Sequence, residues 1–492
     1  MNEDLDKRIA ALSPAQRRML QSQTRKTAPR PGASIAAGIA PSPAPASSNQ
    51  EYLWMLDRRC GGNPGWNVFT GAEFVGPLDV SATHWALLEI ARRHEVARTV
   101  LRCIDGTLMQ VIQPELDFPL PIIDLREFPR EERLLRSRAA IAQLYRAKFD
   151  LSQGPLIRPV LLRLGGEHHQ LLVIMHHAIT DWVSFSILNR EMAALYRART
   201  NKQEAALPLP RLQYRDYAFW EKNWELSEEA EAQTAYWRNN LRGAAEYPVF
   251  PADNARPAVQ TFDGARHPIS FDAHVSGALI AGSRDAGVTP FITVLAALAV
   301  LLRARSGCED VTIGSPVIGR LAAGTQDAFG LFLNHLALRI EAAETGSFRL
   351  LLARAKTTVL GAYANQQIPF GKIVRELYPN PNAAFTPLFQ VMFFYLAMPP
   401  VESLTGLEWR NIEAYGGTSR YDLLFSLWER PEGISGFVEY NTDLFTFITA
   451  ARIGAALELM LIAIAGNFDV HVTALAEIAC REFESTKVAT PA

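Results

Sequence analysis

The chain has 492 residues, 48% of them hydrophobic and 20% charged, which is enough for more than one hydrophobic core. A formal net charge of −2 offers no strong field for nucleic acid or an anionic membrane, so we expect neither partner. Its four cysteines show no CxxC or CxxH spacing, so a disulfide framework and a zinc site are not predicted, and a cytoplasmic location is expected.

The N-terminal segment predicts a short helix on a tether. Ser13, Pro14 and Gln16 form a capping box with proline at the first helical position, which indicates helical structure within residues 1–27. The start of the chain lacks the apolar stretch of a secretory signal. Residues 28–46 are rich in Ala, Pro and Ser and are expected to form a linker. The helix is either a plain tail or a docking element for a partner.

From residue 47 onward, short apolar runs typical of strands alternate with helical patterns. Residues 171–175 and 391–395 are expected as strands, and residues 85–93 and 183–197 as helices. The apolar runs 291–302 and 459–465 fall short of the roughly 20 residues that span a bilayer and predict buried helices.

These alternating elements predict an α/β protein. Proline-rich residues 207–212 and charged residues 221–231 are the expected crossing point between two lobes. The lobes are placed at residues 47–225 and 226–485.

Residues 171–188 carry the strongest chemical signal. Five apolar residues end at His176 and His177, and a helical pattern resumes after Asp181. Histidine has its ordinary pKa near neutrality, so an imidazole at a strand end beside a cleft is suited to accept a proton from an attacking amine or hydroxyl. Paired histidines at a strand end are also common as purely structural groups.

A second histidine pair serves as a comparison. His168 and His169 follow a turn at residues 165–167 and have no acidic residue at the matching spacing. We interpret that pair as a solvated hairpin tip.

The segment HHAITDW together with Ser184 resembles the HHxxxDGxS signature of nonribosomal peptide synthetase condensation domains. Seven further blocks resemble motifs of the same family and follow in the family's order. They are SSNQEYLWML at 47–56, RHEVART at 93–99, YRDYAFW at 214–220, GLFLNHLALR at 330–339, NQQIPF at 365–370, TPLFQVMF at 386–393 and YNTDLF at 440–445. In the GLFLNHLALR block, His335 stands where the family has threonine.

This resemblance implies two chloramphenicol-acetyltransferase-like lobes that form a V-shaped pseudo-dimer around a central tunnel. It also implies partners: a donor and an acceptor carrier protein, or a small free acceptor. Each carrier would insert a phosphopantetheine arm, so the chain itself would bind no cofactor and no metal. Because the chain carries no adenylation or carrier domain, a free-standing enzyme of peptide or hybrid polyketide synthesis is expected.

Within the resemblance, His177 corresponds to the catalytic second histidine. It would orient the acceptor and accept its hydrogen bond or proton as the acceptor attacks the acyl thioester. A hydroxyl needs a base more than an amine does, since an amine with a pKa of roughly 7.7 is already partly deprotonated at neutral pH. The product is an amide or an ester.

The same resemblance gives His176 and Asp181 structural roles in the loop. A buried carboxylate requires a partner, and chain order and context favour Arg320. A plain turn arginine is the alternative.

Trp182, Ser184 and Asn334 are predicted to shape the tunnel. Trp182 departs from the family, which has glycine at that position. The ring could select an unusual substrate, mark a degraded site or point into a core. Retention of His177 and Ser184 argues against decay.

Three other functions remain as alternatives. An epimerisation domain shares the HHxxxDG motif but normally belongs to a long multidomain chain. A stand-alone acyltransferase would use coenzyme A in place of a carrier. A catalytically silent scaffold would bind carriers with Trp182 closing the site.

Overall fold

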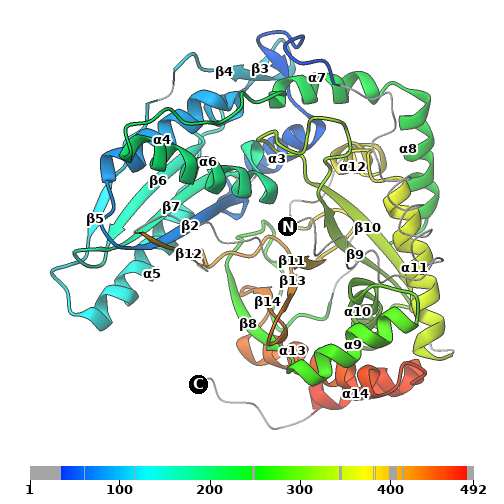
Figure 1. Cartoon of the computed structure of the whole chain (residues 1–492). Coiled ribbons are helices and arrows are strands. Elements are labelled where there is room, and N and C mark those ends of the chain that lie inside the picture. The colour runs from blue at the N-terminus through cyan, green and yellow to red at the C-terminus, as the bar shows by residue number, and fades with distance from the viewer. Residues whose placement is uncertain are drawn as a thin grey trace.

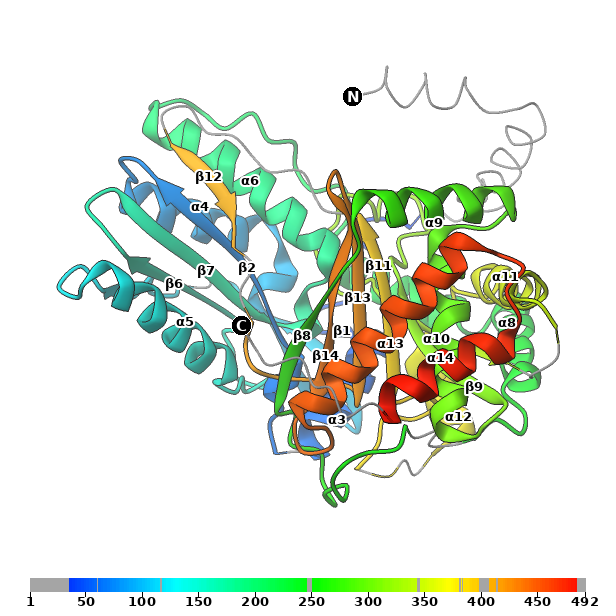
Figure 2. The same ribbon diagram turned by 90° about the horizontal axis from the view of Figure 1, so that it is seen from below.

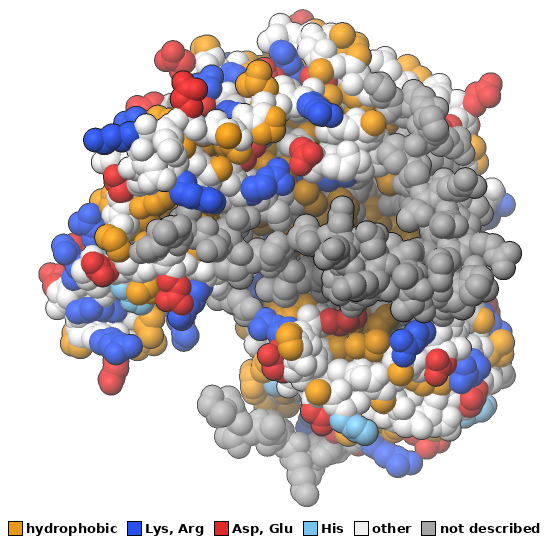
Figure 3. Space-filling model, viewed as in Figure 1, with side chains coloured by type: hydrophobic (Ala, Val, Ile, Leu, Met, Phe, Trp, Pro, Cys, Tyr) orange, Lys and Arg blue, Asp and Glu red, His pale blue; other side chains and the backbone are white. Residues whose placement is uncertain are grey.

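The computed structural model describes residues 35–484 except 60, 116, 246–249, 343–345, 380, 381, 383, 398–406, 413 and 414. Two α/β lobes are joined along one side and diverge on the other (Figures 1 and 2). The molecular surface is hollowed where they diverge (Figure 3). The predicted α/β class is confirmed, whereas the predicted helix within residues 1–27 lies outside the described residues.

The N-terminal lobe is built on a five-stranded sheet in the order β12-β2-β7-β6-β5. Alternate residues of the strands face opposite sides. On β6, Leu161 packs in the main core with α4 and α6, whereas Leu162 packs with Ile141 of α5 in a smaller core. The elements are β2 (Asn67–Val75), β5 (Ile122–Asp124), β6 (Ile157–Arg163), β7 (His168–His176), β12 (Glu408–Asn411), α4 (Val80–Arg93), α5 (Arg130–Arg146) and α6 (Trp182–Thr200).

A small sheet in the order β1-β4-β3 lies at the edge of this lobe and corrects the predicted linker. Ala44 pairs with Gln110, and both Ala44 and Ala46 are fully buried. Residues 35–46 therefore pack on the body, because alanine is small enough for close contact and an edge strand tolerates Pro45. The elements here are β1 (Ala44–Pro45), β3 (Thr99–Ile104), β4 (Thr107–Ile112), α3 (Ser48–Arg59), η1 (Pro64–Trp66) and η2 (Glu95–Arg98).

The C-terminal lobe has a six-stranded sheet in the order β10-β9-β11-β13-β14-β8. Strand β11 runs parallel to β9 and β13, and the other pairs are antiparallel. The strands are β8 (Gly264–Ser270), β9 (Asp310–Val317), β10 (Asn334–Glu341), β11 (Val391–Ala397), β13 (Leu423–Arg430) and β14 (Gly433–Asn441). The helices are α9 (Ala273–Asp285), α10 (Pro290–Ser306), α11 (Phe348–Ala364), α12 (Phe370–Leu377), α13 (Phe447–Gly466) and α14 (Val472–Glu484).

Both predicted apolar helices belong to this lobe. Helix α10 is buried at every position from Ile292 to Arg303. Helix α13 is apolar and long enough to cross a membrane by composition, but it packs against β8, β14 and α14, as a core helix does.

The two lobes interlock. The chain leaves the N-terminal lobe after α6 and crosses along α7 (Tyr214–Trp224) and α8 (Glu228–Asn240) (Figure 1). It later returns, because β12 pairs with β2 of the other lobe. The predicted division at residue 225 is therefore wrong for β12, which covers an edge of β2 that would otherwise lie open.

Candidate active site

The paired histidines stand where β7 ends. This strand lies between β2 and β6, and its apolar residues are buried on both faces. At its last residue, the His176 Nδ1 atom accepts a hydrogen bond from the Ala178 backbone N–H (3.1 Å), which starts the short helix η3 (His177–Ile179). Burial lowers the pKa of His176 to about 3, so this ring is neutral and caps the turn.

His177 is held in one tautomer. Its Nδ1–H donates to the Thr180 carbonyl oxygen (2.8 Å), which leaves Nε2 as the atom with a free lone pair. Among the described residues, no other group forms a hydrogen bond with Nε2. Burial and the charge of Arg420 lower the pKa of His177 to about 3. The site therefore presents a neutral hydrogen-bond acceptor.

Residues from both lobes surround this imidazole. The Trp66 ring lies 6.1 Å from the His177 ring, centroid to centroid. Arg420, just before β13, reaches across from the C-terminal lobe: its Nε donates to the Gly65 carbonyl (2.5 Å) and its Nη2 to the Asn67 carbonyl (3.2 Å). Trp66 and Arg420 were not predicted from the sequence, since neither belongs to a motif that marks it as a neighbour of the histidine.

A cavity of ≈30 Å³ lies beside Trp66 and Arg420, walled by α3, η1, residues 260 and 262, and residues 382 and 385–387. We call it the interlobe cavity. It is far smaller than the roughly 300–1,000 Å³ of a typical small-molecule site.

Asp181 and Arg320 form a buried ion pair between the lobes. The Arg320 Nη2 atom lies 2.8 Å from Asp181 Oδ1 and 3.0 Å from Oδ2, and both side chains are almost inaccessible. The Asp181 Oδ2 atom also accepts the Phe332 backbone N–H (3.1 Å). This is the contact that the sequence predicted for Asp181, and it fastens the histidine loop to the opposite lobe.

Ser184 belongs to this network. It is fully buried, and its backbone N–H and its hydroxyl both lie 2.8 Å from Asp181 Oδ1. Its hydroxyl oxygen accepts the Gly330 backbone N–H (3.0 Å). The prediction that Ser184 shapes the tunnel directly is wrong, because no surface of the side chain is left to face a substrate.

Gly319 allows the turn that presents Arg320. Its φ is +69°, and a Cβ there would lie 1.8 Å from the Phe332 carbonyl oxygen. The guanidinium then donates to the carbonyls of Thr325 and Ala328 and lies 4.1 Å from the Phe332 ring centroid.

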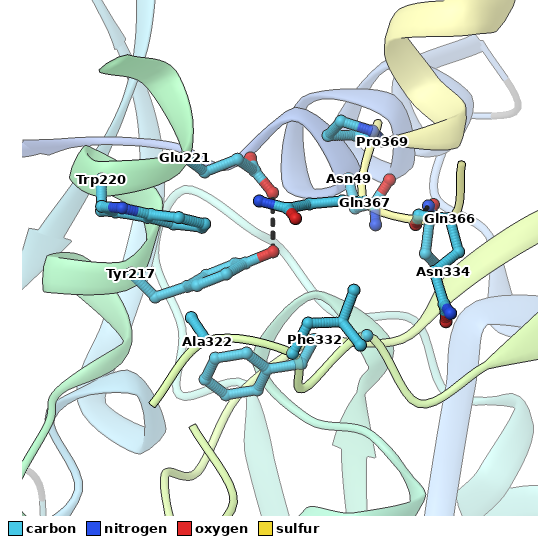
Figure 4. Close-up of a pocket in the computed structure, with 12 residues that line it drawn as sticks. Asn49, Tyr217, Trp220, Glu221, Ala322, Phe332, Asn334, Gln366, Gln367 and Pro369 are labelled. Atoms are coloured by element: carbon cyan, nitrogen blue, oxygen red, sulfur yellow. Dashed lines mark hydrogen bonds between the residues drawn. The ribbon is translucent and has the colours of Figure 1, made fainter. Parts of the chain in front are cut away.

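Asn334 ties the start of β10 to the segment before α12. Its amide donates to the carbonyls of Gln366 (2.9 Å) and Ile368 (2.8 Å), and its Oδ1 accepts the Phe370 backbone N–H (2.8 Å). Asn334 also borders a second cavity of ≈20 Å³ with Tyr217 and glutamine side chains (Figure 4).

Glu221 is buried at this second cavity. Its carboxylate accepts the Ser48 backbone N–H (2.7 Å) and the Tyr217 hydroxyl (2.9 Å; Figure 4). Burial, followed by the nearby charge of Glu225, raises the pKa of Glu221 to about 7. The sequence indicated only a lobe crossing in this segment.

Trp182 is the first residue of α6 and its side chain is 44% exposed. The interpretation that the ring points into a core is wrong. Asp181 caps the helix and Trp182 continues it with ordinary helical geometry, so no positive φ is needed where the family has glycine. The ring packs edge-on against Phe185, with centroids 6.3 Å apart.

The other histidine pair differs from its prediction. His168 opens β7 and its Nε2 lies 2.7 Å from Glu73, while His169 is buried. The predicted hairpin is present, because β6 and β7 are antiparallel and the Leu164 N–H donates to the His168 carbonyl (2.9 Å). The prediction that the pair is solvated is wrong for His169. In the described part of the chain, no three His, Cys, Asp or Glu side chains gather as a metal site.

A family model of the condensation domain matches residues 42–482. The chain belongs to the condensation-domain family. One of the linear gramicidin synthase proteins from Brevibacillus parabrevis is 38% identical over 413 residues, which cover 83% of this chain and 8% of that protein. Phosphinothricin tripeptide synthetase PhsC from Streptomyces viridochromogenes is 36% identical over 478 residues, which cover 96% of this chain and 44% of that protein.

This condensation domain thus spans less than half the length of either synthetase. Among solved structures, the X-domain from teicoplanin biosynthesis superposes with a TM-score of 0.82 at 26% identity, covering 89% of this chain and 99% of that one. The SgcC5 protein from Streptomyces globisporus superposes with a TM-score of 0.73 at 27% identity, covering 87% and 100%. These likenesses confirm the predicted two-lobed condensation fold.

Proposed function

We propose that this condensation domain joins a carrier-bound acyl thioester to a carrier-bound or small free acceptor, and that the acceptor is an amine. The observation that carries the proposal is the fixed tautomer of His177. Its Nδ1 is occupied by the Thr180 carbonyl, and its Nε2 lone pair remains available between the lobes.

The low pKa of His177 favours an amine over a hydroxyl. Protonating a group whose pKa is about 3 at neutral pH costs about 5 kcal/mol, so the ring is suited to accept a hydrogen bond and poorly suited to hold a proton. An amine is nucleophilic as soon as it is neutral. A hydroxyl needs its proton removed as it attacks.

The reaction balances without an acyl-enzyme. The amine nitrogen attacks the thioester carbonyl carbon while its N–H donates to His177 Nε2. The tetrahedral intermediate expels the pantetheine sulfur, and the nitrogen's proton ends on that sulfur. The products are an amide and a free thiol. Any phosphopantetheine arm belongs to a partner, and this chain contributes orientation of the reacting groups.

The test is intact-protein mass spectrometry of an acyl-loaded carrier mixed with this chain and candidate acceptors. Each reaction offers one amine and one hydroxyl acceptor of similar size. We expect the acyl mass to move to the amine. Transfer to the hydroxyl alone would refute the amide proposal, and no transfer from well-loaded carriers would refute the catalytic one. Acyl-coenzyme A as a second donor tests the coenzyme A alternative.

A second candidate function is partner binding. The solved relatives include the X-domain from teicoplanin biosynthesis in complex with OxyB, with a TM-score of 0.82 at 27% identity, covering 90% of this chain and 97% of that one. If carriers bind this chain but no acyl group moves, that function takes precedence.

A further inference from the structure

His335 is a third imidazole close to the catalytic loop, and it comes from the opposite lobe. It is the second residue of β10 and pairs in register with Pro316 of β9. Its ring packs edge-on against Phe370, with centroids 5.8 Å apart, and the side chain is only partly buried. The residue is therefore deep in the fold yet retains accessible surface.

Helix α3 contacts the surroundings of both His177 and His335. The Gln50 side-chain amide of α3 donates to the Ala178 carbonyl (3.0 Å), next to His177. Two residues further along the helix, the Tyr52 ring packs against the Phe370 ring (5.7 Å between centroids), and the Phe370 ring also packs against His335. His335 lies close enough to His177 and Arg420 that a charge on either one lowers the pKa of His335 further, after burial.

His335 differs from its neighbours because its ring nitrogens form no hydrogen bond with another described residue. His177 Nδ1 is occupied by Thr180, and His176 Nδ1 accepts the Ala178 N–H. Two of the Arg420 nitrogens donate to backbone carbonyls. Within the described ranges, no hydrogen bond joins either ring nitrogen of His335 to another residue, and neither nitrogen is among the fully buried polar atoms that lack a partner. The ring nitrogens are therefore accessible, and a polar group without a partner in the protein is free to bind a ligand atom.

We propose that His335 donates a hydrogen bond from its imidazole N–H to the carbonyl oxygen of the donor thioester, on the side opposite His177. This inference rests on the proposed function. When the amine attacks, the carbonyl π electrons move to oxygen, and the N–H of His335 stabilises that oxyanion. As the oxyanion collapses, the C–S bond breaks and the electron pair leaves with sulfur, which takes the proton from nitrogen.

The two imidazoles then have different roles in the reaction. His177 accepts from the nucleophile and His335 donates to the electrophile, so a neutral ring suits both tasks. Threonine, which the family has at this position, also carries a donor but has a shorter reach. His335 is thus a residue that adapts the site to a substrate carbonyl held farther from β10.

Three variants test the proposal: His335→Leu removes the donor, His335→Gln retains an N–H at similar reach, and His335→Thr restores the family residue. His471→Leu is the matched control, because His471 is exposed and lies outside the site. Single-turnover transfer is measured with saturating carriers, and thermal unfolding confirms that each variant is folded.

We expect His335→Leu to lose about 10²- to 10³-fold in the single-turnover rate with an unchanged KM for the carriers. His335→Gln should retain most of the rate and His335→Thr should be intermediate. A wild-type rate in the Leu variant, or equal losses in Leu and Gln, would overturn the inference and leave the proposed function intact. No transfer by the wild type would overturn both.

A binding readout is independent of turnover. The probe is an acyl-pantetheine amide, in which nitrogen replaces the thioester sulfur. Added to protein with ¹⁵N-labelled histidine, it should shift the imidazole signals of His335 and leave those of His471 unchanged. An unchanged His335 signal at saturation would contradict a direct contact.

Discussion

Asp181 and Arg320 are 139 positions apart, come from different lobes and meet at 2.8 Å in a buried ion pair. Asp181 lies four residues after His177, so the loop that carries the paired histidines in one lobe is anchored on the other lobe. Any movement of the lobes relative to each other therefore acts directly on the His177 loop.

Breaking this pair should destabilise the fold. Asp181→Asn and Arg320→Met each leave a buried polar group without its partner, and each should lower the free energy of unfolding by about 3–5 kcal/mol in urea titrations. Arg190→Ala is the control. The Arg190 Nη2 atom lies 3.4 Å from Asp327 Oδ1, and both side chains are exposed. Asp327 belongs to the same segment between β9 and β10 as Arg320. The control substitution should cost less than about 1 kcal/mol. A stable but inactive Arg320 variant would instead give the pair a chemical role.

Asn334 should stabilise the C-terminal lobe through its three hydrogen bonds, which join the start of β10 to the segment before α12. Asn334→Ala removes two donors and one acceptor for the segment before α12, and a loss of about 2–3 kcal/mol in unfolding free energy is expected. Asn365→Ala removes one side-chain bond, to the Gly361 carbonyl, and should cost about 1 kcal/mol or less. Equal losses of unfolding free energy in the two variants would contradict the larger contribution predicted for Asn334.

The sequence predicted the elements whose signal is local. The apolar run before His176 predicted β7, and the run at 291–302 predicted α10. Arg320 could be named because the family resemblance implies an ion pair for Asp181, and chain order and context favour this arginine over others.

Contacts between distant segments could not be predicted in this way. Arg420 reaches the Gly65 carbonyl from 355 positions away, and nothing in its local sequence indicates that contact. Residues 35–46 have the composition of a linker. Ala44 and Ala46 are buried because β1 pairs with β4, and composition alone does not predict that pairing. The return of β12 to β2 likewise depends on an open strand edge in the other lobe.

Trp182 should influence substrate access more than chemistry. Its ring is half-exposed at the start of α6, whereas the His177 loop is fixed by other residues. Trp182→Gly should therefore change the KM for loaded carriers and leave the single-turnover rate within about threefold. Measuring both constants separates the two effects. A lost rate with an unchanged KM would place the ring in the reaction itself.

Buried His176 should make the protein less stable in acid. Its pKa is about 3 when folded, against an ordinary value of 6.5, so only the unfolded chain takes up a proton as the pH falls below 6.5. Between pH 7 and 5 this costs the folded state about 2 kcal/mol. In His176→Asn, the Asn oxygen can still cap Ala178, and unfolding free energies should fall about 2 kcal/mol less over that range. An identical fall would contradict the burial of a neutral ring.

The pH dependence of transfer should follow the acceptor. With an amine acceptor, the single-turnover rate should rise from pH 6 to about 8 as the amine loses its proton. His177, with its pKa near 3, stays neutral throughout and should add no inflection. A second inflection near 6.5 that disappears in His177→Gln would show that this ring titrates during turnover.

The central claim is that His177 acts directly on the acceptor. The decisive measurement is the single-turnover rate of acyl transfer between loaded carriers for wild type and His177→Ala, alongside carrier affinity and thermal unfolding. We predict a loss of about 10²-fold or more in rate, with carrier affinity and folding preserved. A His177→Ala protein that transfers at nearly the wild-type rate would contradict the account.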